Sequence, residues 1–96
     1  MQLHPRHTEI VEAIHTPWGV LVREDYFQFP ETESNLYMVD SAGRPIWFAE
    51  RAMAGDAYAS PMIRVAENLV CCASWHGFDC YINLQDGRLV NAAFTK

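Results

Sequence analysis

The chain has 96 residues, of which 50% are hydrophobic and 12% aromatic, and this is enough for one domain with a core of its own. Lys and Arg number 7 against 12 Asp and Glu, and the net charge of −5 opposes binding to the phosphates of a nucleic acid. No apolar stretch is long enough to span a bilayer, and the first residues lack the apolar segment of a signal peptide. We therefore expect a soluble, cytoplasmic protein with neither a nucleic acid nor a membrane as its partner.

The N-terminal residues divide into a tail and a strand. Residues 1–7 follow neither helical nor strand periodicity, which predicts a flexible tail that folding does not need. Residues 8–15 are ambiguous, because Ile10, Ala13 and Ile14 have helical spacing whereas the β-branched neighbours suit a strand. We favour the strand.

A second strand and an irregular connection follow. The sequence Pro-Trp-Gly at residues 17–19 indicates a turn, and the apolar, β-branched run at residues 20–22 predicts a short strand. Residues 26–34 mix aromatic side chains with Pro30 and acidic residues. Proline is rare inside a sheet, so this pattern predicts an irregular connection whose aromatic rings cover one end of the core.

One sequence pattern occurs twice. Residues 35–44 read NLYMVDSAGR and residues 79–88 read DCYINLQDGR, so that Tyr37 aligns with Tyr81 at a spacing of 44 residues (81 − 37 = 44). Four-stranded propeller blades repeat with a similar period. Each copy ends in Gly-Arg, and the glycine can supply the positive φ of a tight hairpin turn. The pattern predicts two hairpin-containing units.

The rest of the chain reads as strands joined by short turns and one longer loop. We expect strands over residues 36–39, 46–48, 62–66, 69–74, 79–84 and 89–94. Residues 50–61 form a loop of small residues that is long by the usual standard, which makes it the first choice for a binding segment.

The three cysteines, Cys71, Cys72 and Cys80, cannot all pair within one chain, and we expect them to be reduced and packed. If His76-Gly77 forms a two-residue turn, Cys71 and Cys80 share the core face of their hairpin and Cys72 lies on the other face.

These elements together predict an all-β, antiparallel domain of seven or eight short strands, built from two degenerate blade-like units. With so few strands, the arrangement is a sandwich or a partly open barrel.

The first copy of the pattern carries a resemblance to a known family. The segment Leu36 to Asp40, followed by Gly43 and Trp47, resembles the repeat of propellers of the pyrroloquinoline-quinone-dehydrogenase type. The second copy departs from this repeat, with Leu84 in place of the Asp and Asn91 in place of the Trp. From residue 35 onward the chain also resembles small bacterial β proteins that have no assigned activity.

The resemblance implies blade-like units without a cofactor. The quinone enzymes need a full ring of blades and a set of polar and metal-binding residues that this chain lacks. Because the edges of two blades stay open, and open edges invite further pairing, we expect a homodimer.

Two groups of residues are candidates for function. The turn at residues 75–79 holds Trp75, His76 and Asp79, which are the residue types of a general base and its orienting partner, although His-Gly is also what such a turn requires. Tyr37 and Tyr81 alternate away from the core face, and outward aromatic side chains mark an interface or a groove unless a second layer covers them.

The sequence favours a non-enzymatic binding or interaction module with a protein partner. The alternative is a small-molecule-binding or hydrolytic protein with a pocket near Trp75, His76 and Asp79. No metal or other cofactor is expected. The candidate binding residues are Tyr37, Trp47, Tyr58, Trp75, His76, Asp79 and Tyr81.

Overall fold

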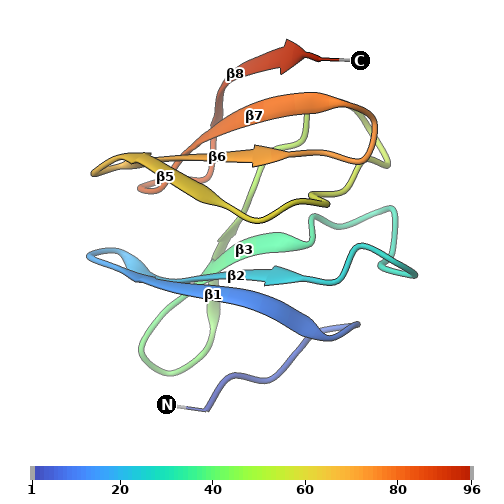
Figure 1. The fold of residues 1–96 in the computed structure, drawn as a ribbon. Coiled ribbons are helices and arrows are strands. Elements are labelled where there is room, and N and C mark those ends of the chain that lie inside the picture. The colour runs from blue at the N-terminus through green and yellow to red at the C-terminus, as the bar shows by residue number, and fades with distance from the viewer. Residues whose placement is uncertain (1, 96) are drawn as a thin grey trace.

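The computed structural model describes residues 2–95, which form eight antiparallel strands and no helix (Figure 1). The N-terminal sheet contains, in chain order, β1 (Ile10–Thr16), β2 (Gly19–Glu24), β3 (Leu36–Val39) and β4 (Pro45–Phe48). The C-terminal sheet contains, in the same manner, β5 (Ile63–Ala66), β6 (Leu69–Ala73), β7 (Phe78–Asn83) and β8 (Leu89–Phe94). The predicted all-β, antiparallel fold is confirmed, and among residues 2–95 no helix could cross a membrane.

The two sheets lie on one another as two layers, with the C-terminal sheet at the top of Figure 1. Alternation along the strands sends every second side chain between the layers. The buried cluster there includes Leu21, Leu36, Met38, Val70, Cys72, Cys80, Ile82 and Leu84. Each large aliphatic side chain buried in this way stabilises the fold by about 1.5–3 kcal/mol.

The ambiguous segment at residues 8–15 becomes strand β1, as expected. It pairs with β2 from Ile10 opposite Glu24 to Thr16 opposite Gly19. Side chains along β1 alternate between half-buried and exposed, with Ile14 packed against the inter-sheet core. Pairing with β2 therefore decides against the helical spacing.

The repeated Gly-Arg pairs lie in the turns that join the third and fourth strands of each sheet. Gly43 has a φ of 81° in the turn between β3 and β4, and Gly87 has a φ of 77° in the turn between β7 and β8. The first turn is closed by the N–H of Gly43 donating to the Asp40 carbonyl over 2.9 Å, and the second by the N–H of Gly87 donating to the Asn83 carbonyl over 2.8 Å. Both glycines occupy tight reversals, as predicted.

The register of the β6–β7 hairpin differs from the two-residue turn considered above. Cys72 lies opposite Cys80, and Cys71 lies opposite Tyr81. Trp75, His76 and Gly77 all belong to the turn, because the N–H of Ser74 donates to the Phe78 carbonyl over 2.8 Å. The additional turn residue shifts the pairing by one position, so Cys72 and Cys80, rather than Cys71 and Cys80, face the core.

The N-terminal segment does not follow the expectation of a flexible tail. Residues 2–8, here called the N-terminal strap, lie against the outer face of the N-terminal sheet, and Leu3 packs on the cluster of Val20, Val22, Tyr37 and Val39. Residue 1 lies outside the described residues. The strap adds a partial third layer on this side of the sandwich (Figure 1).

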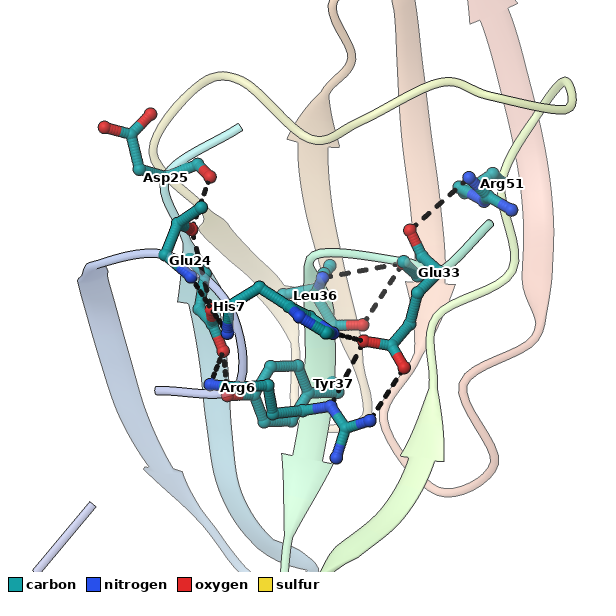
Figure 2. A network of polar contacts seen from close by, with 10 residues as sticks. Arg6, His7, Glu24, Asp25, Glu33, Leu36, Tyr37 and Arg51 are labelled. Atoms are coloured by element: carbon teal, nitrogen blue, oxygen red, sulfur yellow. Dashed lines mark hydrogen bonds and ion pairs between the residues drawn. The ribbon is translucent and has the colours of Figure 1, made fainter. Parts of the chain in front are cut away.

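One buried carboxylate holds the strap in place (Figure 2). Glu24 is completely buried, and it accepts hydrogen bonds from the N–H groups of Arg6 over 2.7 Å, His7 over 3.0 Å and Thr8 over 2.8 Å. The hydroxyl of Tyr37 donates to the same carboxylate. No periodic pattern in the sequence reports such a contact, which explains why the segment reads as a tail.

The loop between the sheets is anchored in the core. Tyr58 is buried, its N–H donates to Asn35 Oδ1 over 2.8 Å, and its carbonyl accepts from Asn35 Nδ2 over 2.8 Å. Asn35 Nδ2 also donates to the Glu24 carbonyl over 2.7 Å. The inter-sheet loop is thereby held beside the connection between β2 and β3.

Candidate binding site

A groove with a volume of about 500 Å³ opens where three segments meet, and it is called here the aromatic groove. The β2–β3 connection, the inter-sheet loop and the β6–β7 turn each contribute to it. Its lining consists of Tyr26, Phe27, Gln28, Phe29, Glu31, Gly55, Ala57 and Trp75.

Four of the eight lining residues are aromatic. Trp75 stacks on Tyr26 with ring centroids 5.1 Å apart and an angle of 25° between the planes. Trp75 remains 56% exposed and Phe27 67% exposed, whereas Phe29 is buried. The three-residue turn carries Trp75 toward Tyr26, and Phe78 packs on Phe94.

The backbone of the groove is strained at one position. Gln28 has a φ of 65°, and it is the one residue other than glycine with a positive φ among residues 2–95. Flanking hydrogen bonds hold this turn, since Asp25 Oδ1 accepts the N–H of Phe27 over 3.0 Å and the Tyr26 carbonyl accepts the N–H of Phe29 over 3.2 Å. Such a conformation costs about 1–3 kcal/mol and is typical of sites that position side chains for binding.

A carboxylate and an imidazole are paired next to the groove. Asp56 Oδ1 lies 2.8 Å from His76 Nδ1 and also accepts the N–H groups of Ala57 over 2.9 Å and His76 over 3.1 Å. The side chain of Asp56 is 1% exposed and that of His76 is 43% exposed. Asp56 thus orients the imidazole ring through Nδ1, which leaves Nε2 as the ring nitrogen for contact with a ligand.

The environment keeps Asp56 ionised. Burial acts to raise the pKa of Asp56, but hydrogen bonds from Ser74, from His76 and from the backbone outweigh it, so this pKa lies below its ordinary value. An ionised, buried carboxylate behind a half-exposed imidazole is the arrangement that orients a general base. Among residues 2–95, no group of three His, Cys, Asp or Glu side chains could hold a metal ion.

The structure brings together Trp75 and His76 of the predicted site residues, and it adds Asp56. Asp79 lies on β7 opposite Ala73, on the outer face of the C-terminal sheet. The sequence alone indicates the loop at residues 50–61 as a binding segment but does not single out Asp56 within it. An acidic residue placed among small residues in that loop is the signal that could have singled it out.

The other predicted site residues lie elsewhere. Tyr37 is buried between the strap and the N-terminal sheet, and Tyr58 is buried between the sheets with its hydroxyl donating to the Glu50 carbonyl over 2.5 Å. Trp47 packs on the inter-sheet core. Tyr81 is half-buried on the outer face of the C-terminal sheet, opposite Cys71 and Asn91.

Comparison with known proteins gives no match to a family model, to a curated protein or to a solved structure.

Proposed function

We propose that this chain is a non-enzymatic binding module and that the aromatic groove is its binding site. The supporting observation is that the rings of Tyr26, Phe27 and Trp75 border one groove of about 500 Å³ while two of them stay more than half exposed. Apolar side chains that line a concave site, supported by a packed sandwich, are typical of ligand and partner binding.

A library of metabolites and short peptides tests this function. A bound molecule stabilises the folded state by mass action, so it should raise the melting temperature of the wild-type protein and change its tryptophan fluorescence. Trp75→Ala should lose both responses. Phe94→Ala, which removes an exposed ring on β8 outside the groove, should keep them. Equal responses from Trp75→Ala and wild type would contradict the proposal.

We further propose that the module forms a homodimer through the outer face of the C-terminal sheet. The strap covers the corresponding face of the N-terminal sheet, whereas Ile63, Cys71, Tyr81 and Asn91 form one cross-strand row on the other sheet, with Ile63 63% exposed. The row itself carries no charge, and Asp79 lies two residues from Tyr81 on the same face, so a second copy can lie on the row without desolvating an ion there.

Light scattering after size exclusion tests the dimer. The wild-type protein should have about twice the chain mass of 11.0 kDa. Ile63→Lys should be monomeric, because it brings a charge into the row. Val11→Lys, at an exposed position of the N-terminal sheet, should remain dimeric. A monomeric wild-type protein at high concentration would overturn this part of the proposal.

We place the protein in the cytoplasm on the basis of its thiols. All three cysteines are free, including Cys72 and Cys80, which lie directly opposite one another on neighbouring strands. Free thiols of this kind favour a reducing compartment.

A hydrolytic function is the alternative, and the pairing of Asp56 with His76 is the observation that favours it. It predicts slow ester hydrolysis by the wild-type protein that disappears in His76→Ala. If a panel of activated esters is hydrolysed no faster by the wild type than by His76→Ala, the pair orients the turn and does no chemistry.

A further inference from the structure

We propose that the aromatic groove binds a small organic cation, of the class that carries a quaternary ammonium group. This inference rests on the proposed binding function and names the chemistry of the ligand.

The charge of the lining is the first argument. Among the eight lining residues, Glu31 is the one acidic residue, and none is Lys, Arg or His. Glu31 Oε2 lies 4.0 Å from the place that a Cβ on Gly55 would occupy, which puts the carboxylate at the wall where the inter-sheet loop meets the connection. The whole chain has a net charge of −5, which adds a field that attracts cations.

Arg51 contacts the segment around Glu31 through backbone carbonyls. Arg51 Nη1 donates to the backbone carbonyls of Glu31 over 2.7 Å, Asp56 over 3.2 Å and Glu33 over 3.5 Å. Its guanidinium therefore ties the two loops together through their main chains. The ion pairs within residues 2–95 do not include the Glu31 carboxylate.

The rings provide the second argument. A cation is attracted to the face of Trp, Tyr or Phe within about 6 Å of the ring centre, and quaternary ammonium groups are held in this way by several rings together. Trp75 and Phe27 are 56% and 67% exposed, and both border the groove together with Tyr26. A quaternary ammonium ion has no N–H group that requires a hydrogen-bond acceptor. Aromatic rings and one carboxylate therefore supply both kinds of interaction that it makes, cation–π contact and attraction to an opposite charge.

The lining also favours a free small molecule over an extended peptide. The groove is built from a connection, a loop and a turn, and none of its lining residues belongs to a strand. A peptide that adds to a sheet needs a row of strand N–H and C=O groups. A volume of about 500 Å³ lies within the range of small-molecule sites.

Choline and 3,3-dimethylbutan-1-ol, its uncharged carbon isostere, are the probes for the test. Both are titrated into ¹⁵N-labelled full-length protein, and the chemical shifts of the Trp75 indole N–H and of the Gly55 amide are followed. We expect choline to shift these signals with at least tenfold higher affinity than the isostere. The same spectra report whether each variant is folded.

Three variants assign the effect. Glu31→Gln should reduce the preference for choline about fivefold while retaining weak binding, because the rings remain. Phe27→Ala, which removes an exposed ring, should weaken choline binding about fivefold or more. Glu67→Gln, at the exposed turn between β5 and β6, is the matched control and should bind as the wild type does.

The outcomes separate this inference from the binding function itself. Equal binding of choline and its isostere would overturn the cationic class and leave the groove as a binding site. Absence of any shift with 50 mM choline would also overturn it, and the library screen with Trp75→Ala would then decide on the binding function alone. Choline binding that moves signals far from Trp75 would overturn the assignment to this groove.

Discussion

Gly87 and Gly55 share a backbone conformation but differ in their surroundings. Gly87 has a φ of 77° and Gly55 a φ of 80°. A Cβ on Gly87 would lie 2.4 Å from Cε3 of Trp47, whereas a Cβ on Gly55 would have no neighbour closer than 4.0 Å. The Trp47 indole of the N-terminal sheet therefore packs directly against the turn between β7 and β8. This contact between the layers is possible because Gly87 has no side chain.

Alanine substitutions at these two positions separate the cost of the positive φ from the cost of a steric collision with Trp47. Gly55→Ala should lower the free energy of unfolding by about 1–2 kcal/mol, which is the cost of a left-handed conformation for an L-residue. Gly87→Ala has the same backbone cost and also brings a methyl group into collision with the Trp47 ring. Its free energy of unfolding should therefore fall by about 1–3 kcal/mol more than that of Gly55→Ala. Urea unfolding measures both. Equal losses would mean that Trp47 moves aside freely.

Asn35 connects three chain segments through its amide. Its removal in Asn35→Ala leaves the Tyr58 N–H, the Tyr58 carbonyl and the Glu24 carbonyl without this partner. Because unsatisfied buried groups each cost about 1–3 kcal/mol, we expect a loss of roughly 3 kcal/mol or more in urea unfolding. Gln85→Ala, an exposed turn position, should change the stability by less than about 0.5 kcal/mol.

At the scale of elements, the strap depends on acidic groups. Burial acts to raise the pKa of Glu24, but hydrogen bonds from Tyr37 and from the strap N–H groups outweigh it and lower this pKa. Arg6 is the main cause of the lowered pKa of Glu33, whose carboxylate it meets at 2.7 Å, and His7 Nε2 lies 2.7 Å from the same carboxylate. Figure 2 shows these contacts converging on the strap from β2 and from the β2–β3 connection.

The strap should therefore release in acid. A carboxyl whose pKa is lower in the folded state stabilises the fold above its unfolded pKa, near 4.3, and this contribution is lost as the pH falls through the folded value. The free energy of unfolding should thus decrease from about pH 4.5 downward. Glu24→Gln should lower the free energy of unfolding by about 2 kcal/mol at pH 7, because the strap N–H groups and Tyr37 no longer donate to a charged carboxylate. The same change should make the decrease in acid less steep.

Urea unfolding at a series of pH values gives the slopes. Glu67→Gln, at an exposed turn, should retain the wild-type slope. Identical slopes for Glu24→Gln and wild type would show that the strap does not depend on the charge of Glu24.

At the scale of the whole molecule, the inter-sheet core unites the two layers. The radius of gyration of 12.1 Å agrees with about 12.5 Å expected for a folded chain of this length, so the layers are packed as closely as in one domain. Glu12 on β1 adds a polar link, accepting a hydrogen bond from Arg23 over 3.0 Å and from the N–H of Met62, just before β5, over 3.0 Å. The sheets should then unfold together.

Thiol labelling tests this cooperativity. Burial raises the pKa of Cys72 to about 12 and also raises that of Cys80, so both react only when the layers separate. Cys71, half-buried on the outer face, should react first. The two slow thiols should react at one common rate that increases in parallel with urea-induced unfolding. Comparable rates for all three would indicate that the sheets separate readily.

Local features of the sequence were sufficient for the strands and for several turns. Strand β8 occupies the predicted residues 89–94, and both Gly-Arg pairs lie in tight turns. Alternation and the need for a positive φ are properties of neighbouring residues, which is why they can be read directly. The resemblance to propeller blades stays a prediction.

The candidate site was only partly accessible from the sequence. Trp75 and His76 could be selected because aromatic and imidazole groups stand together in one turn. Asp56 and Tyr26, which contact them, lie in distant segments, and no pattern in either segment indicates that it meets this turn. The register of β6 and β7 was also out of reach, since one extra turn residue changes which cysteine faces the core.

The sequence alone determined the class of the fold, because hydrophobic alternation and glycine turns act within a few residues. The tertiary structure alone decided that a buried Glu24 holds the strap and that three remote segments enclose one groove. Those features depend on which surfaces meet when two sheets pack, and the free energy of that packing is shared among side chains far apart in the chain.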